Sequence, residues 1–319
     1  MKLKKTEALA LALLLIFGAV LSAAAETVTY RGLTVDKNAE EIDLGKRGVM
    51  DWKSFYAFLD QLPNLKKVDM FGTVLNLQVY RQLSTRYPGV DFGVQFRFNK
   101  HRLRTDDTAF STLWAGGDRT YGFEEISMLT WCRNLYALDI GHNPVKKLDF
   151  LYEMPELRVL IVAICDLTDI TPIASLKHLE YLEIFHNRIE DVSCLKDLPY
   201  LMDLNLVKNR VQDITPLKEI KSLKRLWIHL CDQNNPDYPD AGTLAELQAA
   251  LPNCHIDPES TSTAGGWRKD PHYETIFRMF RSQVYEPFED SDPENMPEPW
   301  RSERLGLTAE PDAETTEAP

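Results

Sequence analysis

Residues 179–200 read LEYLEIFHNRIEDVSCLKDLPY, and residues 201–222 read LMDLNLVKNRVQDITPLKEIKS. Placed one above the other, the two stretches carry apolar residues and one Asn at the same positions, so each is a copy of one 22-residue unit. Copies in this phase extend over residues 135–228 and begin at evenly spaced leucines: Leu135, Leu157, Leu179, Leu201 and Leu223. A fixed period of this length indicates that the chain is built from stacked, similar structural units.

Each copy follows the motif L-x-x-L-x-L-x-x-N/C-x-L. The L-x-L part predicts a short parallel strand whose alternate side chains enter the core. The Asn, as in Asn187 and Asn209, can satisfy backbone groups where the chain turns away from the strand, and Cys165 substitutes there as a small buried residue. The rest of the unit is too short for a full helix and predicts extended or 3₁₀ turns, with Asp-Ile-Thr-Pro at residues 169–172 and 213–216 marking them. One coil cannot bury its own apolar face, so neighbouring coils must stack.

The flanks carry looser copies of the same strand positions. Ile42, Val68 and Val94 are spaced by 26 residues, with helical patterns between them. Residues 97–113 break the phase and predict a hairpin-like insertion. On the other side, residues 243–250 predict a helix, and a last coil begins at residues 251–256.

These motifs resemble the bacterial leucine-rich repeat proteins, in particular the secreted internalin-like group with 22-residue units. The match is close over residues 135–228 and looser over 41–256, where the early repeats depart from the group by being longer and helix-bearing. The resemblance implies an α/β leucine-rich repeat solenoid, with a curved parallel sheet on the concave side and helices and 3₁₀ turns on the convex side. It also implies binding of other molecules, usually proteins, on the concave sheet. It brings no catalytic residue and no cofactor with it.

Composition narrows the classes of function. The 319 residues are 44% hydrophobic and carry a net charge of −12, which is an ordinary globular composition with an acidic excess. Nucleic acid is therefore not expected as a partner, because phosphate binding needs clustered Lys and Arg.

The first residues predict a targeting segment. Lys2, Lys4 and Lys5 precede an apolar run over residues 8–21, which is followed by small residues up to Ala25. This order is typical of a cleaved secretory signal. We therefore expect a signal peptide at residues 1–25, no stable membrane span after cleavage, and a secreted or extracellular protein, with association with the cell surface left open.

The C-terminal part predicts three further segments. We expect the solenoid at residues 26–256, a linker at 257–266, a capping segment at 267–288 and an acidic, disordered tail at 289–319. The capping segment begins with Trp267 and has an amphipathic stretch with one apolar face: Tyr273, Ile276, Phe277 and Phe280. Two interpretations stay open, a cap on the solenoid and a detachable helix that binds a partner.

The candidate site is the concave face, formed by residues between the core leucines. A merely solvated sheet would carry Lys, Glu, Thr and Ser there, whereas this one carries aromatic and branched side chains, typical of an interaction site. The predicted partner-binding residues are Val159, Ile161, Tyr181, Glu183, Phe185, Asp203, Asn205, Arg225, Trp227 and His229. The alternative is that an inserted loop or the C-terminal segment folds over this face.

The predicted function is that of a non-catalytic, secreted scaffold that binds a protein partner of unknown identity. Carbohydrate or cell-wall glycan binding through the concave aromatics is the alternative, because aromatic faces stack on sugars. An enzyme is the hypothesis that the sequence supports least. The pairs Asp139/His142 and Glu183/His186 lie two coils, about 10 Å, apart and cannot share a metal ion. No catalytic motif such as G-x-S-x-G or H-E-x-x-H occurs in the sequence.

The five cysteines occupy core positions of the repeats. Cys165 and Cys231 are three coils, about 14 Å, apart, which is beyond disulfide reach. We therefore expect buried free thiols and no metal site.

Overall fold

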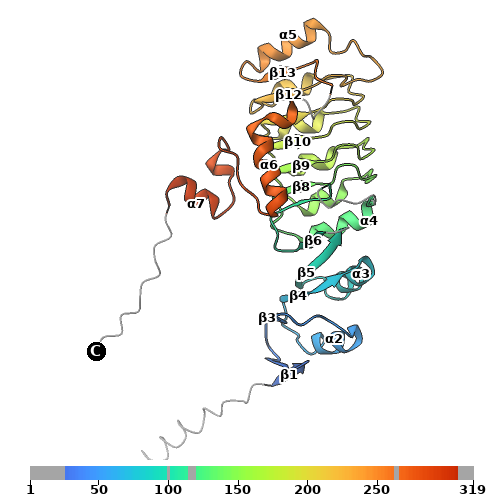
Figure 1. Ribbon diagram of the computed structural model, residues 1–319, viewed down its shortest axis with the longest axis vertical. Helices are drawn as coiled ribbons and strands as arrows, with labels where there is room; N and C mark the ends of the chain where they lie inside the picture. The colour runs from blue at the N-terminus through green and yellow to red at the C-terminus, as the bar shows by residue number, and fades with distance from the viewer. Residues whose placement is uncertain (1–25, 99–100, 114–119, 262–265, 308–319) are drawn as a thin grey trace, which may run out of the picture. The chain divides into compact units, whose positions relative to one another are not determined.

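The computed structural model describes residues 26–98, 101–113, 120–261 and 266–307, and it divides into two compact units (Figure 1). The first unit comprises the described residues up to Thr73 together with Tyr87–Gly93, and the second comprises Val74–Arg86 and the described residues from Val94 onward. The predicted signal peptide at residues 1–25 and the last part of the predicted tail, residues 308–319, lie outside the described residues.

The first unit contains the two earliest, loosest coils. Its hairpin turns at Arg31 and Gly32, both with positive φ (48° and 78°), as two-residue hairpin loops require. The following parallel pair is connected through a helix whose N-terminus is capped by Asp51, a hydrogen-bond acceptor for the backbone N–H of Lys53. The elements are β1 (Thr27–Tyr30), β2 (Leu33–Asp36), β3 (Glu41–Asp43), α2 (Trp52–Leu59) and β4 (Lys67–Leu75), which ends in the second unit.

The second unit holds the regular repeats. Within the described residues, its seven parallel strands follow the order β13-β12-β11-β10-β9-β8-β7. Their register pairs Leu160 with Leu182 and Leu182 with Leu204, which is the 22-residue phase of the sequence. The strands are β7 (Ala109–Ser111), β8 (Ala137–Asp139), β9 (Val159–Ile161), β10 (Tyr181–Glu183), β11 (Asp203–Asn205), β12 (Arg225–Trp227) and β13 (His255–Asp257). The chain is therefore an α/β solenoid of leucine-rich repeats, as the sequence predicted.

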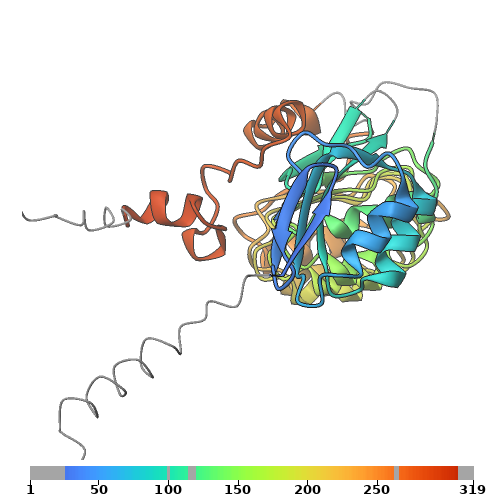
Figure 2. The ribbon, with the colours of Figure 1, turned by 90° about the horizontal axis from the view of Figure 1, so that it is seen from below.

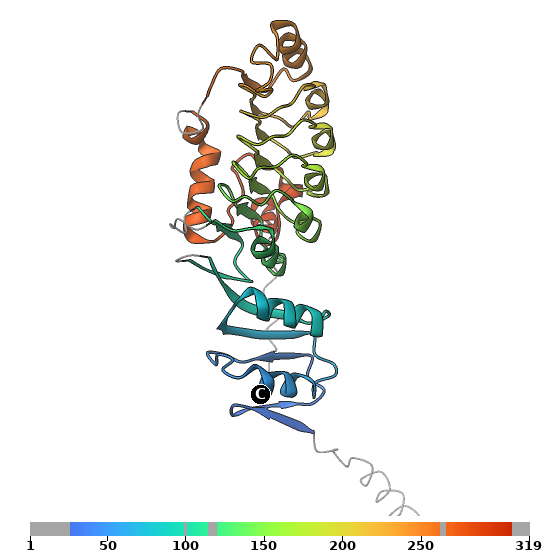
Figure 3. The ribbon, with the colours of Figure 1, turned by 90° about the vertical axis from the view of Figure 1, so that its right-hand side faces the viewer.

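The side of the regular coils opposite the strands carries 3₁₀ turns, as expected from the length of the unit (Figure 3). Asp169 accepts a 2.8 Å hydrogen bond from the N–H of Thr171, and Pro172 occupies the start of the turn. The turns are η1 (Ser127–Trp131), η2 (Asp149–Glu153), η3 (Thr171–Ser175), η4 (Ser193–Asp197) and η5 (Thr215–Glu219).

Helices and a hairpin flank the regular coils of this unit. The predicted insertion at 97–113 begins inside an antiparallel hairpin, in which Arg97 is opposite Arg102. The predicted helix at 243–250 begins two residues earlier than expected. The flanking elements are α3 (Leu77–Arg86), β5 (Asp91–Phe98), β6 (His101–Arg104), α4 (Phe123–Ile126), α5 (Ala241–Ala250), η6 (Trp267–Lys269), α6 (Pro271–Ser282), η7 (Pro293–Asn295) and α7 (Trp300–Leu305).

The repeated Asn joins each coil to the one before it. The amide nitrogen of Asn187 donates to the carbonyl of Ile184 in its own coil (3.0 Å) and to that of Val162 in the preceding coil (2.9 Å). Its amide oxygen accepts from the N–H groups of Cys165 (3.0 Å) and Leu167 (3.1 Å). The buried Asn thus satisfies turn backbone that no strand partner reaches.

The residue before each Asn or Cys has left-handed backbone. These residues are His142, Ile164, His186, Lys208 and Leu230, with φ of 62°, 56°, 54°, 59° and 49°. Ile164 is the least suited to this position, because a β-branched side chain in this region is strained.

The cysteines are free thiols, as predicted, and all except the half-buried Cys194 are buried. Burial raises the pKa of Cys165, Cys231 and Cys254 to about 12, so these thiols stay protonated and unreactive.

Candidate binding face and its C-terminal cover

The candidate site is the side of the β7–β13 sheet that carries the residues between the core leucines, which we call the strand face. Described residues 266–307, which we call the C-terminal segment, lie across it, and Figure 3 shows α6 along this side of the strands with the 3₁₀ turns on the other. Figure 2 shows α6 beside the same coils in a second view. One buried cluster unites the two parts, with Val159, Tyr181 and Trp227 from the sheet and Ile276 and Met279 from α6.

Trp267 is the anchor of the segment and is 0% exposed. Its ring centre lies 5.5 Å from that of Tyr181 and 5.6 Å from that of Trp227, and its Nε1 donates a 3.0 Å hydrogen bond to Glu183 Oε2. The preceding Gly266 is required by this packing, because a Cβ there would lie 2.9 Å from the Trp227 ring.

Arg225 binds the segment through polar contacts. Its Nε donates to Asp203 Oδ1 (2.8 Å), its Nη1 donates to the carbonyl of Trp267 (3.0 Å), and it forms an ion pair with Asp270 (3.1 Å). The guanidinium also lies 3.8 Å from the centre of the Trp267 ring, a cation–π contact.

His272, in the first turn of α6, lies between two carboxylates. Its Nδ1 is hydrogen-bonded to Asp203 of the sheet, its Nε2 is 2.7 Å from Asp290 Oδ1, and its ring stacks on Phe288. Burial alone would lower the pKa of His272, but the hydrogen bonds and charges of Asp203 and Asp290 outweigh it and raise the pKa above 6.5.

The chain after α6 returns along the beginnings of the strands. Ser291 Oγ and Asn295 Nδ2 each donate a 2.6 Å hydrogen bond to Glu180, and the carbonyl of Asn295 accepts from Arg158 Nε at 3.0 Å. The prediction of disorder over 289–319 is therefore wrong for residues 289–307, which include η7 and α7. The reason is that this stretch is held by buried polar anchors, which leave no apolar pattern in the sequence.

The structure covers most of the predicted partner-binding residues. The buried ones are Val159, Ile161, Tyr181, Glu183, Asp203, Asn205, Arg225 and Trp227. Phe185 and His229 are half-buried; Lys208 Nζ lies 5.4 Å from the Phe185 ring, and His229 Nδ1 is 3.0 Å from the Pro258 carbonyl. The expectation of an open face is therefore wrong, and the alternative of a face covered by the C-terminal segment is correct.

The covered face retains buried polar atoms that are imperfectly paired. Within the described part of the chain, Glu183 Oε1, Asn205 Nδ2 and Arg225 Nη2 have no hydrogen-bond partner. Arg268 Nη2 is 3.8 Å from Glu183 Oε1, an ion-pair distance without a hydrogen bond. Burial raises the pKa of Glu183 to about 7 and that of Asp139, on the same face, to about 6.

The residues that sequence reasoning missed are the polar partners of the face, such as His272, Asp290 and Asn295. Their roles depend on which coil they meet, and this is not encoded in local spacing. The sequence signal that did point to the cover was the Trp267 segment with its amphipathic stretch.

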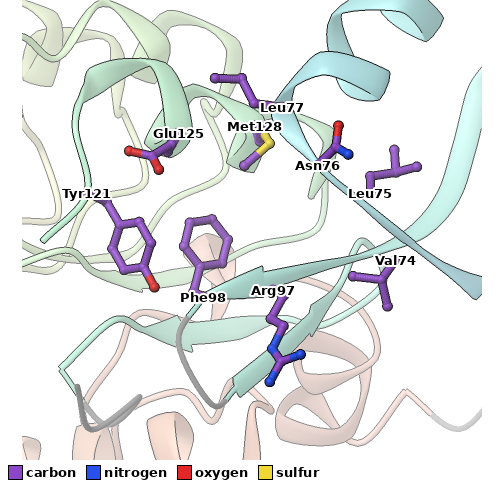
Figure 4. Close-up of a pocket in the computed structure, with 9 residues that line it drawn as sticks. All are labelled: Val74, Leu75, Asn76, Leu77, Arg97, Phe98, Tyr121, Glu125 and Met128. Atoms are coloured by element: carbon purple, nitrogen blue, oxygen red, sulfur yellow. The ribbon is translucent and has the colours of Figure 1, made fainter. Parts of the chain in front are cut away.

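A separate hollow of about 440 Å³ lies within the second unit (Figure 4). The rings of Phe98 and Tyr121 meet edge to face, with centres 5.0 Å apart, and form part of its wall. It contains none of the predicted site residues. Across the described ranges, no group of three His, Cys, Asp or Glu side chains could hold a metal ion, and none of the helices found there is long and apolar enough to cross a membrane.

No family model matches this chain, and no curated protein matches its sequence. Among solved structures, the chain is similar to an internalin (inlF) of Listeria monocytogenes at 19% identity, with 75% of this chain and 52% of that one covered and a TM-score of 0.35. It is similar to internalin C2 (inlC2) of the same organism at 17% identity, with coverage of 75% and 83% and a TM-score of 0.34. A leucine-rich repeat protein of Leptospira interrogans matches at 20% identity, with coverage of 53% and 38% and a TM-score of 0.31. The chain thus spans about half of the first of these structures, and such distant likenesses carry no argument about the partner.

Proposed function

We propose that the protein is a non-catalytic, exported scaffold that binds another protein through its strand face. The observation that carries this proposal is that the face already packs against a peptide segment, the chain's own C-terminal segment, through the apolar side of an amphipathic helix. Export is supported by the signal-like pattern of residues 1–25.

The chemistry of the covered face favours an amphipathic helix as the partner's binding element. Within this chain, Ile276, Met279 and Phe280 of α6 pack on the face together with Trp267. The three α6 residues follow the i, i+3, i+4 spacing of one side of a helix. A partner helix with the same apolar spacing and an adjacent aromatic residue would find the same contacts once the segment leaves.

The glycan alternative receives less support from the geometry. The contacts on this face are those made to a polypeptide, because Tyr181 and Trp227 pack against the Trp267 indole and Arg225 donates to the Trp267 backbone carbonyl. Arg225 also pairs with an acidic side chain of the segment, Asp270, whereas a neutral sugar carries no charge to pair with it.

The test uses the chain's own segment as the probe. A labelled peptide of residues 266–296 is titrated into a Trp267→Ala form of the protein, whose own cover is weakened. We expect saturable binding, and we expect the matched peptide carrying Trp267→Ala to bind at least about tenfold more weakly, because the aromatic anchor supplies much of the buried area.

A second substitution, in the receptor, tests whether the peptide binds at the strand face. Adding Trp227→Ala to the receptor, with an unchanged Tm, should weaken binding of the unmodified peptide at least about tenfold. Equal affinity for the two peptides would contradict the proposal. Binding of an N-acetylglucosamine oligomer that depends on Trp227, without peptide binding, would replace it with the glycan alternative.

A further inference from the structure

Two of the groups through which the C-terminal segment meets the strand face, His272 and Glu183, can change their protonation near neutral pH. His272 joins Asp203 of β11 to Asp290 of the returning chain. Asp270, at the start of the same helix, is 4.0 Å away, and two cations pair with the carboxylates that contact His272: Arg225 with Asp203 and Lys224 with Asp290. The buried Glu180 and the exposed His255 also face this cluster.

A protonated His272 suits this arrangement and a neutral one does not. The imidazolium donates from both ring nitrogens, one to each carboxylate. A neutral ring has one N–H, so one of the two carboxylates would face a nitrogen lone pair. When His272 loses its proton, one charge-assisted hydrogen bond between the C-terminal segment and its surroundings is lost. The carboxylates of Asp203 and Asp290 then both face a neutral ring.

Glu183, which lies on the sheet beneath the segment, also favours its protonated form when the segment is docked. It is 0% exposed, and its Oε2 accepts from Trp267 Nε1. The titratable groups that face it are Tyr181, Arg268, Tyr273 of α6 and the second buried acid, Asp139. Among the described residues, its Oε1 has no hydrogen-bond acceptor or donor in contact. A neutral carboxyl costs less there than a carboxylate, which would be a buried charge with one incompletely paired oxygen.

We infer that the C-terminal segment is a pH-responsive cover of the strand face, held closed by bound protons in acid and released as the pH rises. The consequence for partner binding rests on the proposed function, because the released face is the proposed binding site. The opening itself does not depend on that proposal.

The direction follows from proton linkage. The pKa of His272 is raised in the closed state, so its contribution to closure is fully present below pH 6.5 and is lost as the pH rises through the closed-state pKa. The pKa of Glu183 is about 7 when covered and 4.5 in its ordinary state, so closure becomes less favourable as the pH rises from 4.5 to about 7. Asp139, raised from 3.8 to about 6, acts in the same direction.

The expected size of the effect is measurable. For Glu183 alone, the difference between the two pKa values corresponds to a change of roughly 100- to 300-fold in the closing equilibrium. About a tenfold part of this loss falls below about pH 5.5, and His272 and Asp139 add to the remainder, so closure should weaken by at least about 30-fold between about pH 5.5 and about pH 8.

The experiment is hydrogen exchange of the intact protein at those two pH values, corrected for intrinsic exchange rates. We expect the protection of residues 271–282 to fall by at least about 30-fold at the higher pH, while the strands around Leu160 and Leu204 keep theirs. Equal protection of α6 at both pH values, or lower protection in acid, would overturn the inference. Equal loss at the central strands would mean global unfolding and would overturn it as well.

Two variants test which side chains cause the pH dependence of closure. Glu183→Gln keeps the side-chain shape but cannot ionise, so α6 should be protected at least about tenfold more than in the wild type at about pH 8. The matched control is Glu190→Gln, an exposed side chain of the same coil, which should leave the pH profile unchanged. His272→Asn, which also cannot ionise, should reduce the pH dependence of α6 protection and leave the part that is due to Glu183 and Asp139.

The outcomes separate this inference from the proposed function. A flat profile in wild type and both variants would refute the pH-responsive cover and leave the peptide-binding test unaffected. A clear pH profile with no peptide binding would keep the cover and refute the proposed function.

Discussion

Replacing Trp267 with Ala should release the C-terminal segment without unfolding the repeats. The side chain is fully buried, and its contacts are with the strand face: the rings of Tyr181 and Trp227, the carboxylate of Glu183 and the guanidinium of Arg225. Truncating a buried Trp costs about 3–5 kcal/mol. The inter-coil hydrogen bonds, including those of Asn187, are not touched by the substitution, so the cost falls on the docking of the segment.

The assay is limited proteolysis with mass spectrometry, combined with thermal unfolding followed by circular dichroism. We expect proteolytic cleavage within residues 266–307 to become at least about 100-fold faster than in the wild type. The regular repeats, β7 to β13, should still unfold in one cooperative transition. Trp300→Ala is the matched control, because Trp300 is half-buried and contacts Tyr136 and Tyr285 at the end of the segment. Wild-type resistance to cleavage in Trp267→Ala, or a collapse of the whole second unit at once, would refute the reasoning.

Two further predictions concern the coils themselves. Leu182→Asp should unfold the middle coils, because an unpaired charge at this fully buried position costs several kcal/mol; a variant that melts within about a degree of the wild type would contradict the assigned register. Ile164→Asn should stabilise the protein by about 0.5–1 kcal/mol, since Ile164 is 36% exposed and β-branched in left-handed backbone that Asn tolerates. Urea unfolding measures the change, with Val162→Asn as a buried control in the same coil that should lose stability, and a loss in Ile164→Asn would show that its contacts outweigh the strain.

The repeats could be predicted from the sequence because each coil encodes its own fold. The spacing of Leu179, Leu182 and Asn187 is set by one strand and one turn, and the structure confirms strand, turn and register. The early coils were predicted in outline only, since their helices vary in length.

The cover could be anticipated only in part. The amphipathic stretch was assigned an apolar face with Phe277, yet the structure buries Ile276, Met279 and Phe280 and leaves Phe277 36% exposed. Spacing alone does not fix the rotation of a helix, which here follows from the position of Trp267 on the sheet. Nor can a local pattern show that Asn295 meets Glu180, because this contact joins residues 115 positions apart.

The C-terminal segment contacts both ends of a run of coils that otherwise interact only with their neighbours. At one end, the carbonyl of Trp267 accepts from Arg225 of β12; at the other, the carbonyl of Gln283 accepts from the N–H groups of Thr108 and Ala109 at β7. A stack held by nearest-neighbour contacts alone would fray and stretch one coil at a time. With the segment docked, a pulling force along the stack is carried by α6 in parallel with the coils, so the first yield event should be the detachment of the segment, and peeling of single coils should follow it at lower force.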